Sequence, residues 1–171
     1  MFVASFIGTP PMNLVEADVA VEGDRVDVKV GPTTITAGAS ALARYPRIRD
    51  CNGKKVVLGI RAEDLHPAAD RPSFPTFNAR IDLVEALGSG LMAYFTIDAT
   101  AVKTQAHVDM EAESGVTNGD GDSESVVSGA RPNLVAAFPP RIMLRIGDSA
   151  PVAVDPDNIH FFDLETGAAL R

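Results

Sequence analysis

Histidine and cysteine are the residue types best suited to bind a metal ion or act as a nucleophile, and this chain has few of them. His66, His107 and His160 lie far apart in the sequence, without the short ligand spacings of a zinc site. Cys51 precedes an Asn-Gly turn, so we interpret it as a turn or edge residue. No G-x-S-x-G nucleophile elbow is present. The pattern therefore predicts neither a metal site nor a catalytic residue.

Two glycine motifs resemble nucleotide-binding loops but lack the context that such loops need. Gly53 and Lys54 do not complete a P-loop, because Ile48 occupies the position of its first glycine. Residues 88–93, GSGLMA, fit the G-x-G-x-x-A pattern formally. That pattern binds a dinucleotide only between a strand and a helix, whereas the following LMAYFTI has β-strand composition. We therefore expect a hairpin turn at residues 88–90 and no nucleotide site.

Acidic side chains are concentrated in one segment. Residues 109–130 contain six acids and no base, and they are rich in Gly and Ser. Residues 118–124 resemble the start of a calcium loop, but Ser123 and Gly129 stand where that loop needs Gly and Glu. A solvated linker is favoured over weak cation binding. Because such a composition cannot bury enough apolar surface to order itself, we predict a long, flexible acidic loop.

Length, charge and cysteine content narrow the class of protein. The chain has 171 residues, of which 46% are hydrophobic, which suits one domain or two small ones. Its net charge of −8 argues against nucleic-acid binding, which needs a basic face. No apolar run approaches the roughly 20 residues of a membrane span. The N-terminus lacks the basic region of a signal peptide, and a single cysteine suits a reduced compartment, so we expect a cytoplasmic location.

The elements that must position these residues have the pattern of β-strands. Val15, Val19, Val26 and Val28 alternate with polar residues, with a Gly-Asp turn between the two runs. Residues 39–50 allow one helical turn that ends before Pro46, and residues 66–76 are predicted to be a loop. Short strands at this spacing predict an all-β barrel or sandwich. The predicted strands are residues 15–21, 26–30, 33–36, 56–60, 79–83, 92–97, 102–108, 133–138, 152–154 and 159–162.

Four phrases in one order carry a resemblance to a known family. Residues 2–19, 56–65, 79–97 and 155–170 resemble the C-terminal regulatory region (TOBE, or MalK-type OB fold) of the ATPase subunits of carbohydrate-importing ABC transporters. Ala62 departs from the family by replacing a usual proline. The matching positions are Phe2 to Asn13; Gly59, Arg61 and Glu63; Val84, Glu85, Leu87 and Gly88; and Phe162, Asp163, Thr166 and Gly167.

The resemblance implies a fold and a domain organisation. It predicts an OB-fold-like barrel with short helical turns over residues 14–171, with residues 109–130 as an insert that the family does not explain. Residues 1–13 would connect this barrel to an upstream ATPase domain. The Walker motifs, ATP and magnesium belong to that domain, and this chain would use no cofactor of its own. The start at the connecting phrase suggests a fragment or a truncated gene product.

The resemblance also implies partners. In such transporters this region holds two ATPase subunits together, acts on the permease subunits indirectly and receives cytosolic regulators at the inner face of the membrane. The implied partner is therefore a second copy. Gly59 and Glu85 match positions tied to regulator contact. A close backbone approach is the favoured explanation at Gly59, and a solvated charge is an equal alternative at Glu85. Phe6 and Ile7 are predicted to be core residues or, alternatively, a partner-facing patch.

Two other functions remain open from the sequence. Related TOBE domains bind oxyanions, for which Lys54, Lys55 and Arg61 are the clustered candidates. An OB-fold nucleic-acid module needs aromatic platforms on a positive groove, and the chain has no Trp, two Tyr and a net negative charge. We therefore rank the interaction module first, the oxyanion site second and nucleic-acid binding third.

Overall fold

The alternating valines form the first hairpin, as predicted. In the computed structural model, β1 (Asn13–Glu22) pairs antiparallel with β2 (Arg25–Val30), and Val15, Val19, Val26 and Val28 are buried. Gly23 in the turn has a φ of 60°, a left-handed conformation that favours glycine. The structure describes residues 10–87, 90–102 and 132–171.

The first sheet gathers strands from both ends of the chain. Its order is β10-β4-β1-β2-β3, and its neighbours are antiparallel. The strands added to the first hairpin are β3 (Thr33–Thr36), β4 (Lys55–Ile60) and β10 (His160–Asp163). β4 thus lies between the first strand and the last, and its side chains are buried from Val56 to Ile60.

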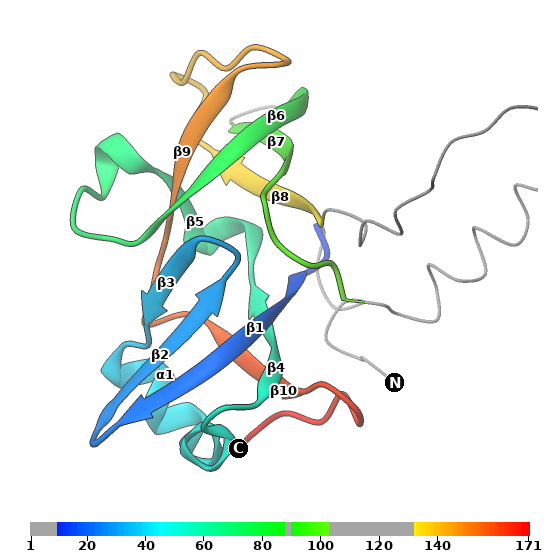
Figure 1. Cartoon of the computed structure of the whole chain (residues 1–171). Coiled ribbons are helices and arrows are strands. Elements are labelled where there is room, and N and C mark those ends of the chain that lie inside the picture. The colour runs from blue at the N-terminus through cyan, green and yellow to red at the C-terminus, as the bar shows by residue number, and fades with distance from the viewer. Residues whose placement is uncertain (1–9, 88–89, 103–131) are drawn as a thin grey trace, which may run out of the picture.

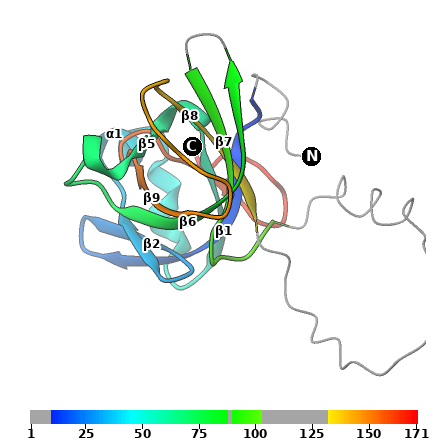
Figure 2. The ribbon, with the colours of Figure 1, turned by 90° about the horizontal axis from the view of Figure 1, so that it is seen from above.

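The second sheet is built from the middle of the chain. Its order is β5-β9-β6-β7-β8, again antiparallel. Its strands are β5 (Leu65–Pro67), β6 (Thr76–Leu87), β7 (Gly90–Thr96), β8 (Asn133–Phe138) and β9 (Ser149–Val154). Leu87 pairs with Gly90, which confirms the predicted hairpin at this position. Figure 1 shows this sheet above the first, and Figure 2 shows both from above.

Short helical turns connect the strands of the two sheets. They are α1 (Ala39–Arg44), η2 (Pro46–Cys51), η3 (Ala62–Asp64) and η4 (Ala68–Asp70). α1 ends before Pro46, as predicted, but the chain then continues as a 3₁₀ helix. Pro46 begins that helix because a first helical position needs no N–H donor and suits the fixed φ of proline. Among the described residues, no helix is both long and apolar enough to cross a bilayer.

Two expected elements differ from the structure. Residues 66–76 were expected to form only a loop, but His66 and Pro67 belong to β5, which pairs with β9. A proline is tolerated there because β5 is the edge strand of its sheet. Of the predicted strand at residues 102–108, only Val102 lies within the described residues, and it is outside any strand. The acidic segment 109–130, Phe6, Ile7 and His107 lie outside the described residues.

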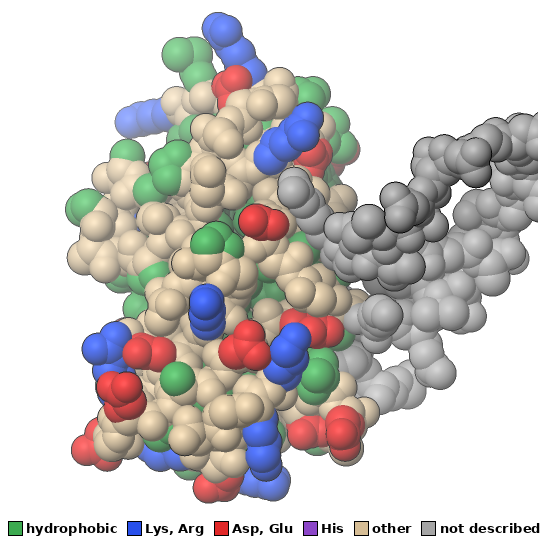
Figure 3. All heavy atoms as spheres, in the orientation of Figure 1, with side chains coloured by type: hydrophobic (Ala, Val, Ile, Leu, Met, Phe, Trp, Pro, Cys, Tyr) green, Lys and Arg blue, Asp and Glu red, His purple; other side chains and the backbone are tan. Residues whose placement is uncertain are grey.

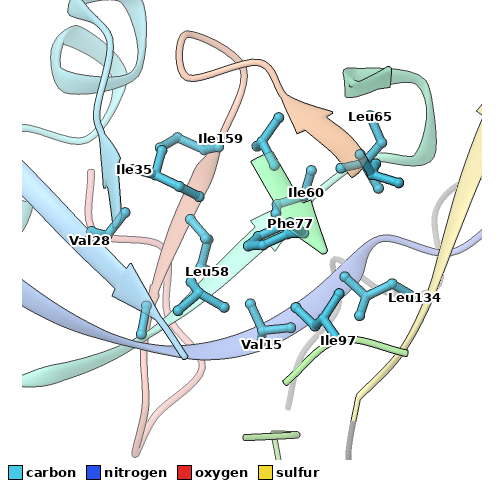
Figure 4. Packing of buried hydrophobic residues seen from close by; sticks show 14 of the residues in the cluster. Val15, Val28, Ile35, Leu58, Ile60, Leu65, Phe77, Ile97, Leu134 and Ile159 are labelled. Carbon is cyan, nitrogen blue, oxygen red and sulfur yellow. The ribbon is translucent and has the colours of Figure 1, made fainter. Parts of the chain in front are cut away.

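A single large core fills the space between the sheets. Figure 4 shows Leu58 and Ile60 of β4, Phe77 of β6 and Leu134 of β8 among its members, and all four are at most 2% exposed. Burying an aliphatic or aromatic side chain of this size contributes roughly 1.5–3 kcal/mol. The fold is therefore mostly β, as the strand pattern predicted.

Candidate interaction surfaces

Gly59 is buried in the middle of the first sheet, where neighbouring side chains leave no room for a larger residue. It pairs with Leu14 of β1 and with His160 of β10. A Cβ at this position would lie 2.5 Å from Met12 Sδ and 2.8 Å from Phe162 Cε2. This geometry explains the glycine by a close approach of side chains over the strand. Contact of Gly59 with a regulator stays a prediction.

Those side chains belong to a second, smaller apolar cluster. Met12, Val57, Val102 and Phe162 are its buried members. The chain that follows β7 reaches β1 beside this cluster, because Glu16 N–H donates to Thr100 O at 3.2 Å and Val15 forms a β-bridge with Ala101. The cluster thus holds Met12, near the start of the described residues, close to Val102, which follows β7. The predicted roles of Phe6 and Ile7, which lie outside the described residues, remain predictions.

Glu85 lies on the projecting part of the β6–β7 hairpin. β6 pairs with β9 only from Thr76 to Arg80, whereas its pairing with β7 continues to Leu87. Glu85 is exposed, and its Oε2 accepts a hydrogen bond from Tyr94 Oη at 3.1 Å. That hydrogen bond is the main cause of a raised pKa at Tyr94. The position is accessible to a partner, and its contact with a regulator stays a prediction.

Exposed apolar side chains lie at the end of the second sheet from which the β6–β7 hairpin projects. Among the described residues, the large hydrophobic side chains exposed to solvent are Leu83 at 43%, Met143 at 95% and Ile146 at 67%. Leu83 lies in β6, and the other two lie in the connection between β8 and β9. We call this group the apolar end. Sequence reasoning missed it, although the run RIMLRI at residues 141–146 is a signal that points to it.

His160 is held neutral by its surroundings. Its Nδ1 lies 2.6 Å from the hydroxyl of Tyr45, whose ring also packs edge-on against it. Burial, with a smaller contribution from the charges of Arg61 and Arg44, lowers the pKa of His160 to about 4. The Tyr45 hydroxyl thus shares a hydrogen bond with Nδ1 of a neutral ring. This contact joins the end of α1 to β10.

The pKa of Asp64 is shifted in the opposite direction, although the charges of Arg61 and Arg44 act on both groups. Burial, with smaller contributions from the charges of Glu63 and Asp155, raises the pKa of Asp64 to about 6. Its backbone carbonyl accepts a hydrogen bond from Asp155 N–H at 3.0 Å, which joins η3 to the turn before β10. Groups of three or more possible metal ligands are absent from the described residues. His66, in the other sheet, packs against Phe74, and burial lowers its pKa.

The predicted oxyanion residues do not converge. Lys54 precedes β4 and Lys55 begins it, whereas Arg61 follows it, and a strand of this length separates its ends by roughly 20 Å. Lys55 pairs with Glu16 at 3.5 Å beside an open hollow of about 450 Å³. Acids outnumber bases around that hollow, which disfavours an anionic ligand. Its charged lining residues are Glu16, Asp18, Lys29, Lys55 and Asp98.

Neither tyrosine offers a platform for nucleic-acid bases. Tyr45 is only 4% exposed and packs against His160 and Phe161. Tyr94 donates its hydroxyl proton to an acidic side chain. Stacking of successive bases needs exposed rings along a positive groove, so this surface lacks the required features.

Comparison with known proteins gives the family context. Residues 8–65 match the MalK OB fold domain family. The chain is 30% identical over 176 residues to the trehalose import ATP-binding protein SugC of Mycobacterium tuberculosis H37Rv, covering 99% of this chain and 40% of that protein.

Two further relatives extend this picture. The oligosaccharides import ATP-binding protein MsmX of Bacillus subtilis is 27% identical, covering 100% of this chain and 38% of that protein. The sn-glycerol-3-phosphate import ATP-binding protein UgpC of Cupriavidus pinatubonensis is 28% identical, covering 99% and 38%. The chain therefore spans about 40% of the curated relatives that it matches, in their C-terminal part, and their catalytic domain lies outside it.

Proposed function

Because this chain belongs to the MalK-type OB-fold region at the C-terminus of ABC importer ATP-binding subunits, we propose that it holds two such subunits together and receives regulatory signals. The observation that carries this proposal is the match over nearly the whole chain to the C-terminal parts of several import ATPases. ATP and magnesium are bound by the ATPase domain, and this region contributes no catalytic group.

A dimerising region acts by raising the effective concentration of one ATPase domain beside the other. A tethered partner experiences a local concentration that reaches the millimolar range, whereas a free partner must be recruited from solution. ATP hydrolysis then depends on opening and closing within one assembly. In this proposal residues 1–13 connect the ATPase domain to the first strand, and the permease subunits sense this region only through that domain. The assembly works on the cytoplasmic face of the membrane, transporting a sugar or glycerol 3-phosphate.

The experiment compares the ATP-binding subunit with and without residues 14–171. ATPase activity is measured over a range of subunit concentrations. We expect half-maximal specific activity to require at least about a tenfold higher concentration without the region. Fusion of the ATPase domain to an unrelated dimeric protein is the control, and it should restore activity at low concentration. An unchanged concentration dependence contradicts the proposal.

A further inference from the structure

We infer that the apolar end of the second sheet, formed by Leu83, Met143 and Ile146, is the surface on which a second copy of this chain docks. This inference rests on the proposed function and assigns its dimer contact to one face. Single exposed apolar side chains are common on monomers, but a contiguous group marks an interaction surface. Here every large hydrophobic side chain exposed within the described residues lies at this one end.

The connection between β8 and β9 is fixed to the strand that carries Leu83. Gly147 N–H donates to Ile81 O at 2.8 Å, and Ile81 N–H donates to Asp148 O at 2.9 Å. Asp148 N–H in turn donates to Arg145 O at 3.1 Å. Gly147 has a φ of 89°, which lets the chain turn back onto β6. The apolar side chains are therefore presented by an anchored surface, so little conformational entropy is lost when a partner binds.

Successive side chains in the connection between β8 and β9 alternate between the protein interior and solvent. Ile142 and Leu144 are half-buried and line an apolar hollow of about 170 Å³ with Phe138, whereas Met143 between them is exposed. A hollow of this size is large enough to receive an apolar side chain. A protruding methionine beside an apolar hollow suits a two-fold interface, in which each copy gives the same residues to the other.

The charges around the apolar end identify the occupant. Arg141 and Arg145 are exposed beside Met143, and Asp82 and Asp148 are exposed beside Leu83 and Gly147. None of these four side chains forms an ion pair or hydrogen bond with another described residue. Figure 3 shows hydrophobic, basic and acidic side chains close together over the end at which β6, β7 and β9 lie.

A surface that carries both signs of charge is complementary to itself. In a two-fold dimer, the arginines of one copy can face the aspartates of the other, around an apolar centre. An anionic membrane or an acidic peptide would pair with the arginines and be repelled by the aspartates. A second copy is therefore the partner that satisfies all these groups at once.

The test uses sedimentation equilibrium of the 171-residue chain and its variants. Met143→Asp and Ile146→Asp place a charge at the centre of the contact, and each should raise the dimer dissociation constant at least about tenfold. Thr34→Asp adds the same charge on the exposed edge strand β3 of the other sheet, opposite Lys29, and should leave the constant within about twofold. Circular dichroism and thermal melting confirm that each variant is folded.

A complementary pair of variants tests the charges separately. A chain with Arg141→Glu and Arg145→Glu, and a chain with Asp82→Lys and Asp148→Lys, should each remain monomeric alone. Mixed together, they should form a heterodimer. A dimeric wild type whose constant is unchanged by these substitutions overturns this inference and leaves the proposed function standing. A wild type that stays monomeric at high micromolar concentration overturns both, and binding to anionic phosphatidylglycerol vesicles without self-association overturns the choice of partner.

Discussion

The side-chain amide of Asn13 bonds both the backbone N–H and the backbone carbonyl of Val135, so that one side chain of β1 joins the first sheet to β8 of the second. Val135 N–H donates to Asn13 Oδ1 at 2.7 Å, and Asn13 Nδ2 donates to Val135 O at 2.8 Å. The same Nδ2 also donates to Ile60 O at 3.0 Å. Asn13 is the buried polar side chain of the described residues.

Replacing Asn13 by leucine should destabilise the fold by roughly 3 kcal/mol. The substitution leaves the backbone groups of Val135 without partners in a buried place, and each unsatisfied group costs about 1–3 kcal/mol. Urea unfolding followed by circular dichroism measures the free energy of unfolding. The control is Asn133→Leu at an exposed position of β8, which should cost less than about 1 kcal/mol. Equal losses for the two variants would refute a bridging role for Asn13.

Replacing Gly59 by alanine should destabilise the protein by about 1–3 kcal/mol, because a Cβ at this position overlaps Met12 and Phe162. Adding Met12→Ala removes the nearest obstacle. The double variant should therefore lose less than the sum of the two single variants, which a double-mutant cycle of unfolding free energies measures. Strictly additive losses would show that Met12 does not restrict Gly59.

Replacing Asp64 by asparagine should stabilise the protein at pH 7. The folded state raises the pKa of Asp64 from 3.8 to about 6, so its stabilising effect is complete below pH 3.8 and is lost as the pH rises through 6. Asparagine stays neutral, so we expect a gain of about 1 kcal/mol at pH 7 after allowance for solvent screening, and none at pH 3.5.

Thermal unfolding at the two pH values measures this difference. Asp24→Asn, in the exposed turn between β1 and β2, is the matched control and should change stability by less than about 0.5 kcal/mol at either pH. A gain for Asp64→Asn that is the same at both pH values would contradict the assigned titration.

Replacing Arg61 by glutamine should raise the pKa of His160 above about 4, because after burial the charge of Arg61 is the next largest cause of its lowering. A lowered pKa gives stability that is present above pH 6.5 and is lost as the pH falls through 4. The wild type should therefore lose stability over this range more steeply than the variant. NMR titration of the imidazole measures the pKa, and an unchanged value would contradict the assigned effect of the Arg61 charge.

Removing the Glu85 carboxylate should lower the pKa of Tyr94 and change the stability of the protein little. Glu85→Gln leaves an acceptor but removes the charge, so the raised pKa of Tyr94 should fall toward 10. Because both residues are on a projecting hairpin, stability should change by less than about 0.5 kcal/mol. Ultraviolet titration of the tyrosines follows the shift, with Tyr45→Phe as background so that only Tyr94 is observed. A Tyr94 pKa that does not fall would contradict the assigned effect of the Glu85 carboxylate.

Local patterns predicted the strands best where side-chain alternation and turn chemistry agree. The hairpin of β1 and β2 and the turn after Leu87 are of this kind, because a half-buried strand shows its period directly. β5 was missed because proline usually opposes a strand, and the pairing of Pro67 with Val152 is a contact over a long distance in sequence. Such pairings leave no local signal.

The candidate site residues likewise include some that the sequence singled out and some that it did not. The sequence singled out Gly59 as a position of close approach, and the structure shows that the side chains of Met12 and Phe162 crowd it. The apolar end was not predicted, because the exposure of Met143 and Ile146 depends on how their connection lies on β6. The sequence shows that these residues are hydrophobic, but only packing decides which of them face solvent.

The position of β10 beside β4 has a consequence for how the chain folds. β4 is followed by about a hundred residues before its second neighbour is reached, and Asp157 near that neighbour also accepts the N–H of Ser40 at the start of α1. Contacts of such sequence separation slow folding to the millisecond-to-second range. During synthesis, the open edge of β4 stays unpaired until β10 has left the ribosome, and an unpaired edge is a template for aggregation. Chaperone demand should therefore be highest between the emergence of β4 and that of β10.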